Sequence, residues 1–246
     1  MAEMCGDPFG VVVVGRDDVA TSIVKLVHAS GHRATLLDQA GAAIADADLV
    51  IQCGPESLQD RRSQLRAIAA YATDSVVIGC CTLVLPLSEL RADLPRADQI
   101  VGTHFMHPAD RLRLCEVILP PETKPATERR LAELLDALGV DAVVACDAAG
   151  FVLNRLLLPV LFDAVRLVEA GCASMDDIDL AMRRGCGWPA GPFEILDLVG
   201  LDVAASCGSI VAERLDDERF EPPSSLQELV AQGRVGRSCG AGFRAH

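Results

Sequence analysis

Short apolar runs alternate with helical patterns along the first 147 residues. Runs rich in β-branched residues lie at 11–14, 33–38, 48–52, 75–79, 100–105, 114–119 and 141–146. Between the first two runs, Val19, Ile23, Leu26 and Val27 fall on one helical stripe, and similar stripes follow later. Strands that alternate with helices in this way predict a mostly parallel α/β sheet.

After about residue 150 the strand patterns stop and helical patterns continue. We therefore predict two domains, an α/β domain over 1–147 and an all-helical C-terminal domain over 148–246. Ser174-x-x-Asp177 and Ser225-x-x-Glu228 have the pattern of capping boxes and predict two helix starts. The glycine-rich segment 233–242 is expected to wrap the surface.

The first two runs, with the helical stripe between them, have the layout of a mononucleotide-binding unit. A strand of four valines ends at Gly15, a helix follows, and the second strand ends in Asp38, 23 positions after that glycine. An acidic residue at this place accepts hydrogen bonds from a ribose diol, which favours NAD over NADP. The α/β domain is thus expected to be a Rossmann-like, doubly wound sheet, with Gly15 and Asp38 as cofactor-binding residues.

Two features abbreviate this unit. In the pattern G-x-G-x-x-G only Gly15 is present, because Asp17 and Ala20 stand at the other two glycine positions. We expect Asp17 and Asp18 to lie at the start of the following helix, where their carboxylates satisfy free backbone N–H groups and take the place of the cofactor phosphates. A scaffold that binds dinucleotide weakly or not at all therefore stays open. In addition, only residues 39–47 separate two strands, which predicts about one turn of helix there.

The charge and cysteine content exclude several classes of partner. Lys+Arg 22 against Asp+Glu 35 gives a net charge of −13, and Lys25 and Lys124 are the two lysines. No basic stripe exists, so nucleic acid is not expected as a partner. The ten cysteines, scattered from Cys5 to Cys239 without a C-x-x-C motif, indicate reduced thiols and a cytoplasmic protein. We expect neither a signal peptide nor a membrane span.

His104 and Glu116 are the candidates for proton chemistry. They lie in consecutive strand-like runs, and a histidine oriented by a carboxylate of a neighbouring strand is a common acid/base pair. The alternative is a packed or capping histidine. His104-x-x-His107 with Cys115 has no spacing of a closed metal site, so no metal is expected.

Two further groups, an arginine cluster and the cysteines, carry expectations of their own. Arg61, Arg62 and Arg66 form the nearest approach to a basic cluster. We expect them to solvate a helix face, and contact with a phosphate is the alternative. Cys80 and Cys81 end a strand, where a thiol is a candidate for reactivity, whereas most cysteines are expected to be small buried hydrophobes.

Longer motifs resemble one family. They are Thr103-His104-Phe105-Met106-His107-Pro108, Cys115-Glu116-Val117-Ile118, Gly150-Phe151-Val152-Leu153-Asn154-Arg155, Gly187-Trp188-Pro189-Ala190-Gly191-Pro192-Phe193-Glu194 with Asp197, Gly200 and Asp202, and the tail Gly236-Arg237-Ser238-Cys239-Gly240-Ala241-Gly242-Phe243. With these motifs the chain resembles the 3-hydroxyacyl-CoA dehydrogenase family.

The resemblance implies an NAD-dependent oxidoreductase of fatty acid β-oxidation that interconverts 3-hydroxyacyl and 3-oxoacyl thioesters. It implies that His104 is the acid/base and Glu116 its partner, and that Asn154 contacts the substrate and the histidine. Thr82 falls near the family's active-site serine. The resemblance also implies an acyl-CoA or other acyl thioester as substrate and a homodimer formed through the helical domain.

Two other functions stay open from the residues. One is a non-catalytic or NAD-independent relative that acts as a dimeric binding or scaffold subunit. The other is proton chemistry by His104 and Glu116, such as hydration or isomerisation, without hydride transfer.

Overall fold

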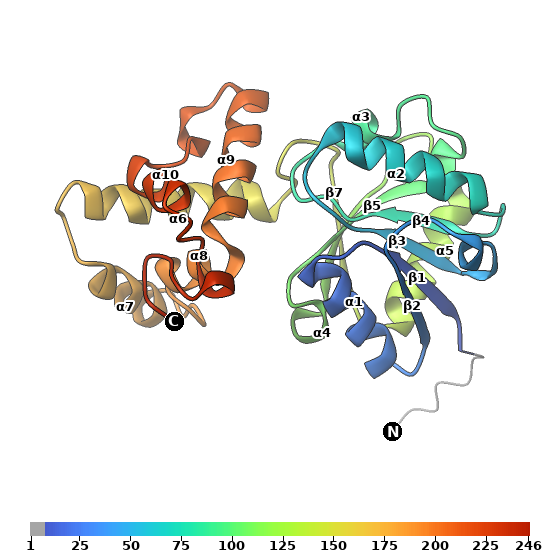
Figure 1. Ribbon diagram of the computed structural model, residues 1–246, viewed down its shortest axis with the longest axis horizontal. Helices are drawn as coiled ribbons and strands as arrows, with labels where there is room; N and C mark the ends of the chain where they lie inside the picture. The colour runs from blue at the N-terminus through green and yellow to red at the C-terminus, as the bar shows by residue number, and fades with distance from the viewer. Residues whose placement is uncertain (1–7) are drawn as a thin grey trace. The chain divides into compact units, whose positions relative to one another are not determined.

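The computed structural model describes residues 8–246, and seven strands of its first part form one sheet (Figure 1). The strands are β1 (Gly10–Val14), β2 (Arg33–Leu37), β3 (Leu49–Gln52), β4 (Val77–Cys80), β5 (Ile100–Phe105), β6 (Leu114–Ile118) and β7 (Asp141–Ala145), in the order β2-β1-β3-β4-β5-β6-β7. All neighbours are parallel except β5 and β6, which are antiparallel. The predicted fold class, a Rossmann-like sheet followed by a helical domain, is confirmed.

Helices cover both faces of this sheet. They are α1 (Asp18–Ala29), α2 (Leu58–Tyr71), α3 (Leu87–Arg91), α4 (Ala109–Leu112) and α5 (Pro125–Ala137). Successive side chains of a strand point to opposite faces. Ile51 of β3 therefore packs in the core under α1 and α5, whereas Gln52 contacts Gln64 of α2 on the other face. The buried β-branched strands supply the core on both sides.

The connection from β2 to β3 is as short as predicted. It contains one 3-10 helix, η1 (Ala42–Asp46), in place of an α-helix. Ile44 of this turn is fully buried and closes the edge of the core. A further 3-10 helix, η2 (Ala97–Gln99), precedes β5.

The rest of the chain is helical. It contains α6 (Leu153–Glu169), α7 (Met175–Gly185), α8 (Pro192–Val199), α9 (Leu201–Leu215) and α10 (Ser224–Ala231), with 3-10 helices η3 (Glu218–Phe220) and η4 (Arg237–Cys239). This second compact unit runs from Val152 to His246, and the first ends at Phe151. Within residues 8–246 no single helix has the length and apolarity to cross a bilayer, although the bent pair α8 and α9 meets those criteria by length and composition alone.

One of the two predicted capping boxes is wrong. Ser174 does cap α7, because its hydroxyl accepts a hydrogen bond from Asp177 N at 3.1 Å. Ser225, in contrast, lies inside α10, which already begins at Ser224 after Pro223. Its backbone N–H donates to Glu169 Oε1 of α6 at 2.8 Å. A carboxylate from a distant helix thus takes the place of the local cap.

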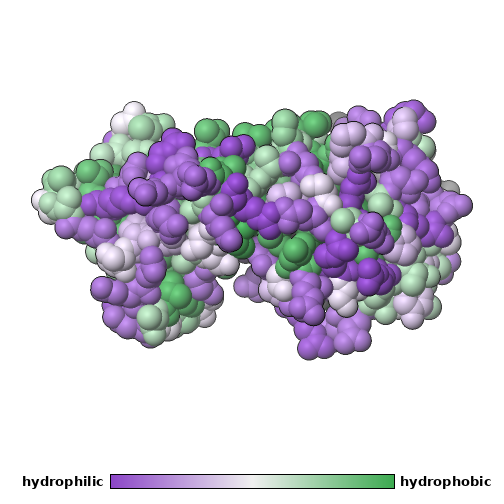
Figure 2. Space-filling model, turned by 90° about the horizontal axis from the view of Figure 1, so that it is seen from above, coloured by the Kyte–Doolittle hydropathy of each residue, from purple (hydrophilic) through white to green (hydrophobic). Residues whose placement is uncertain are grey.

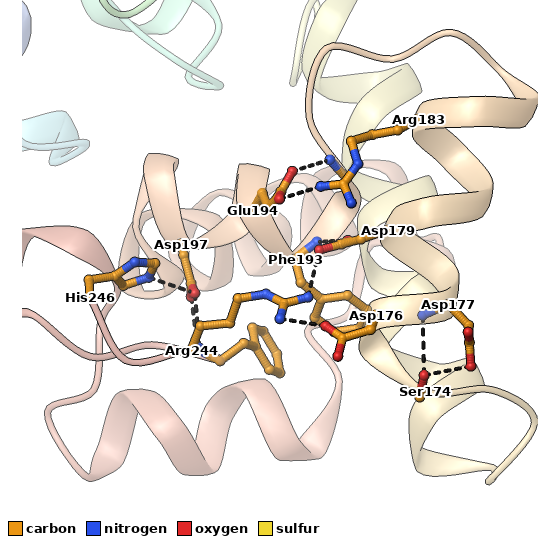
Figure 3. A network of polar contacts seen from close by, with 12 residues as sticks. Ser174, Asp176, Asp177, Asp179, Arg183, Phe193, Glu194, Asp197, Arg244 and His246 are labelled. Carbon is orange, nitrogen blue, oxygen red and sulfur yellow. Dashed lines mark hydrogen bonds and ion pairs between the residues drawn. The ribbon is translucent and has the colours of Figure 1, made fainter.

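The glycine-rich tail is anchored in the helical unit and does not simply wrap its surface (Figure 3). Buried Asp197 of α8 accepts hydrogen bonds from Phe243 N at 2.8 Å and Arg244 N at 3.0 Å, and its Oδ2 also contacts His246 Nε2 at 2.9 Å. The Phe243 ring packs edge-on against Phe193, with ring centroids 5.0 Å apart. A Cβ at Gly242 would collide with Asp197, so this glycine is required by close approach.

We predict that Asp197→Asn destabilises the protein by about 2 kcal/mol. The amide NH₂ that replaces Oδ2 can only donate, whereas Arg244 N is itself a donor that faces this atom. Urea unfolding of the variant measures the loss. Glu213→Gln, on the exposed side of α9, is the matched control and is expected to unfold like the wild type. Equal stability of the two variants would contradict the anchoring role of Asp197.

Candidate active site

His104 and Glu116 face each other across the antiparallel strands β5 and β6. The register pairs these two residues directly, and His104 Nδ1 lies 2.7 Å from Glu116 Oε2. Both side chains are almost fully buried. Phe151 lies beside the imidazole, with ring centroids 6.0 Å apart. Two polar side chains are thus held in a fixed orientation inside an apolar environment.

This contact determines which nitrogen of His104 is available for chemistry. A carboxylate can only accept hydrogen bonds, so ionised Glu116 requires a proton on Nδ1. The neutral ring then carries its lone pair on Nε2, where it can accept a proton from a substrate. Glu116 also stabilises the imidazolium that forms when Nε2 is protonated. The pair therefore has the geometry of a general acid/base with an orienting carboxylate.

Thr82 follows β4 and takes part in a separate polar network. It lies two residues beyond Cys80, whose strand partner is Gly102, and His104 likewise lies two residues beyond Gly102. The Thr82 hydroxyl donates to Glu56 Oε2 at 2.9 Å and accepts from Leu85 N at 3.1 Å. Because the hydroxyl proton of Thr82 is directed to Glu56, it does not point to a substrate in this structure. A role of Thr82 toward substrate stays a prediction.

Arg61 is the centre of this network, and the expectation that it solvates a helix face is wrong. Its side chain is 2% exposed, pairs with Glu56 at 2.7 Å, and donates to Gln52 Oε1 at 3.0 Å and to Cys81 O at 2.7 Å. Only Arg66 of the arginine cluster is exposed, since Arg62 is half-buried and donates to two backbone carbonyls.

A sequence signal for this burial exists. Arg61 stands three residues after Leu58, four before Leu65 and seven before Ile68, so it lies on the apolar stripe of α2. Glu56, its charge partner, was not singled out from the sequence. Together they tie the loop after β3 to the loop after β4.

The predicted cofactor residues lie at the carboxyl ends of β1 and β2. Gly15 follows β1, and a Cβ there would lie 2.8 Å from Cys53 Cβ, so only glycine fits. Asp17 caps α1 as predicted, because its Oδ1 accepts from Ala20 N at 2.7 Å. Asp38 follows β2 and pairs with Arg16 at 2.8 Å. Arg16 is thus turned toward Asp38 and not toward Asp17.

These residues fit a dinucleotide, with one electrostatic conflict. Asp38 is exposed, and a ribose diol would compete with Arg16 for its carboxylate. Gly15 lets a ligand approach the backbone closely. Asp17 places a carboxylate at the positive end of α1, where a pyrophosphate would bind. The site therefore retains its ribose end and is weakened at its phosphate end.

Asn154 is the last of the predicted site residues, and a metal site was not expected. Asn154 lies half-buried in the first turn of α6, in the second unit, and its contact with substrate and histidine stays a prediction. Among the described residues, no three His, Cys, Asp or Glu side chains come together as a group able to hold a metal ion.

We predict that Asp17→Asn raises the affinity for NADH about fivefold, equivalent to about 1 kcal/mol. Asparagine caps a helix as well as aspartate does, so the variant removes the charge and keeps the fold. Calorimetric titration with NADH measures the effect.

Asp18→Asn is the matched control, because it removes one charge from the exposed side of the same turn. We expect a smaller change for this variant. Equal affinities for the wild type and Asp17→Asn would mean that the carboxylate does not oppose the cofactor.

Comparison with known proteins gives consistent matches along the chain. Residues 24–148 match the NAD binding domain of 3-hydroxyacyl-CoA dehydrogenase, and residues 150–246 match its C-terminal domain. A probable 3-hydroxyacyl-CoA dehydrogenase of Caenorhabditis elegans is 35% identical over 230 residues, which are 92% of this chain and 74% of that protein. The mitochondrial hydroxyacyl-coenzyme A dehydrogenase of Homo sapiens is 36% identical over 206 residues, 83% of this chain and 65% of that protein.

The fold leads to the same relatives. The crystal structure of FadB2 from M. tuberculosis superposes with a TM-score of 0.91 at 26% identity and covers 98% of this chain and 100% of that one. The predicted resemblance is confirmed, and so is NAD as the cofactor of this type of domain. By its two domain matches and its fold, the chain belongs to the 3-hydroxyacyl-CoA dehydrogenase family, whose members are NAD-dependent oxidoreductases.

Proposed function

We propose that the protein interconverts 3-hydroxyacyl and 3-oxoacyl thioesters, with His104 as the acid/base and Glu116 as its orienting partner. The observation that supports this most directly is the 2.7 Å contact between the two buried side chains inside an NAD-binding type of domain. Burial removes both ionisable groups from water, which lowers the stability of the fold, and a role in proton transfer explains why the chain keeps them there.

His104 performs the proton transfer in this proposal. In the direction of oxidation, Nε2 accepts the proton of the 3-hydroxyl as the C3–O bond becomes a carbonyl. Glu116 accepts the hydrogen bond from Nδ1 throughout and balances the positive charge of the imidazolium. In the direction of reduction, the same Nε2 returns the proton to the oxygen.

The cofactor half of the site is formed by Gly15, Asp38 and the start of α1. Bound NAD supplies the acceptor for the hydride of C3. Asp38 would hold the ribose diol, and Gly15 would let the backbone approach the phosphates. Asp17 opposes the phosphates by its charge and lowers the affinity.

The proposed substrate class is an acyl-CoA or a related acyl thioester. The relatives are named for 3-hydroxyacyl-CoA and 3-hydroxybutyryl-CoA, and a further relative is the alpha subunit of a fatty acid oxidation complex in Idiomarina loihiensis. These names support a role in fatty acid oxidation. A cytoplasmic location stays a prediction.

We also propose that the protein forms a homodimer through its helical unit. Leu156, Val160 and Leu167 of α6 are exposed and follow one another at helical spacing, so they lie on one side of the helix. The Leu156 side chain is 69% exposed. Apolar residues also reach the surface on the face shown in Figure 2. An apolar helical stripe in water favours a partner of the same chemistry, such as a second copy of α6.

The alternative of a scaffold subunit without catalysis is supported by one observation. Asp17 takes a backbone amide at the start of α1 that a phosphate would otherwise meet. A scaffold function would leave the buried pair of His104 and Glu116 without a role, and for that reason we favour the dehydrogenase.

We predict that His104→Gln lowers kcat for acetoacetyl-CoA reduction by about 10²–10⁴-fold, the usual contribution of a general acid/base. NADH affinity is expected to stay within about twofold, because the imidazole acts on the proton and not on cofactor binding. Steady-state kinetics and NADH titration measure the two effects separately.

His28→Gln is the control for this variant, since His28 is exposed in the last turn of α1. It is expected to keep the wild-type kcat. Wild-type turnover by His104→Gln would rule out the proposed role of the imidazole.

For the dimer, we predict that Leu156→Glu yields monomers, because each copy would place a carboxylate against the apolar stripe of the other. Light scattering after size exclusion reports the mass. Leu112→Glu is the control, because Leu112 is an exposed apolar residue of the first unit (56% exposed, against 69% for Leu156), and this variant is expected to leave a dimer. A monomeric wild type would overturn the proposal.

A further inference from the structure

Two thiols lie side by side at the carboxyl edge of the sheet, outside the set of residues that the proposed reaction uses. Cys53 follows β3, and Cys81 follows β4. The register pairs Gln52 with Cys80, and the ladder continues one residue further because Cys81 N donates to Gln52 O at 2.8 Å. Cys53 and Cys81 are therefore the next neighbours across the two strands, with backbones about 4.8 Å apart as in any sheet.

Their side chains point to the same face. Both belong to the core cluster under α1 and α5. Cys80, in between, points to the opposite face, where its thiol donates to Gln52 Oε1 at 3.2 Å. Two cysteines at adjacent backbone positions on one face have the Cα separation that a disulfide requires.

The two thiols are also chemically distinct from the other buried cysteines. A hydrogen bond from the Cys53 thiol lowers the pKa of Cys81, against the opposing effect of burial, and the N–H of Phe105 and the charge of Arg61 lower it further. The same contact raises the pKa of Cys53. Burial raises the pKa of Cys80 to about 12. Among the thiols of this edge, Cys81 is thus the one whose pKa is lowered, and Cys53 is its neighbour on the adjoining strand.

We propose that Cys53 and Cys81 are a reversible oxidation site, at which a peroxide drives formation of a disulfide that disturbs the adjacent cofactor loop. The Cys81 thiolate attacks one peroxide oxygen, the O–O bond breaks, and hydroxide leaves, which gives a sulfenic acid. The Cys53 sulfur then attacks this sulfenic acid, the S–O bond breaks, and water leaves with the Cys53 proton. The hydroxide takes up the proton that Cys81 released when it formed its thiolate. The two thiols thus lose two electrons, and the peroxide is reduced to two molecules of water.

The surroundings explain why the disulfide would affect the cofactor loop. An S–S bond of about 2 Å is shorter than any non-bonded contact between two sulfur atoms, so its formation draws the Cys53 and Cys81 side chains, and with them the two loops, closer together. Cys53 lies directly against Gly15, with no room for even a Cβ between them. Cys81 precedes Thr82, and its carbonyl accepts a hydrogen bond from Arg61. A shift of either residue therefore moves the turn after β1 or the Arg61 network.

The test treats the full-length protein with hydrogen peroxide and maps its peptides without reduction. We expect a peptide pair that joins Cys53 to Cys81, about 2 Da lighter than the sum of its thiols, which dithiothreitol separates again. Cys53→Ser and Cys81→Ser remove this pair. Cys80→Ser, the neighbouring thiol on the opposite face, is the matched control and keeps it. Because mapping needs no turnover, its outcome is independent of the proposed dehydrogenase reaction.

NADH titration of the reduced and oxidised forms tests the effect on the cofactor loop. Oxidation is expected to weaken binding at least about tenfold, because displacements near 1 Å have effects of this size on positioning loops. Dithiothreitol restores the affinity, and Cys53→Ser shows no such loss after the same treatment. Oxidation of Cys81 to a sulfinic acid without a disulfide would overturn the proposal. So would oxidation confined to other cysteines, or a disulfide that leaves NADH affinity unchanged.

Discussion

The antiparallel pairing of β5 with β6 is the constraint on which the candidate site depends. It places Glu116 opposite His104 between two buried strands. A slip of one residue would turn Glu116 to the other face of the sheet and leave the imidazole without a partner. Gly102 helps to exclude that slip, because a Cβ there would lie 2.8 Å from Ile118 Cβ of its paired residue. The register that packs the core and the register that orients the histidine are the same.

After β1, helix stability and ligand binding compete for the backbone N–H groups at the start of α1. Asp17 satisfies a backbone amide at the start of α1, which stabilises the helix, but it brings a negative charge to the place where phosphates bind. On the α2 face, Arg61 and Glu56 form a buried ion pair that fixes the loops after β3 and β4. The loops after β3 and β4 are therefore held in place under α2, whereas the charge of Asp17 at the start of α1 opposes phosphate binding.

Periodicity and local chemistry in the sequence predict much of this arrangement. The apolar runs predicted all seven strands. The strands β1, β3, β4, β5 and β6 are buried on both faces and need such residues, whereas β2 and β7 are largely exposed. The short link between β2 and β3 excluded a full helix. The Asp17 cap follows from local chemistry and was also predicted. The facing of His104 and Glu116 followed from their places in consecutive strands.

The predictions that proved wrong concern side chains and backbone groups whose partners lie far along the chain. The arginine cluster was judged by its charge, whereas Arg61 lies on the apolar stripe of α2 and finds Glu56 and backbone carbonyls inside the core. Ser225 has the local pattern of a cap, but Glu169 of α6 takes its amide. Gly236 and Gly242 of the tail are required because they approach Asp197 closely, and no local pattern reveals that buried acceptor. The most direct test of the dehydrogenase function mixes the wild-type protein with NADH and acetoacetyl-CoA and follows NADH absorbance together with the products. We expect loss of NADH and formation of an equal amount of 3-hydroxybutyryl-CoA. Binding of both ligands without any loss of NADH would contradict this function.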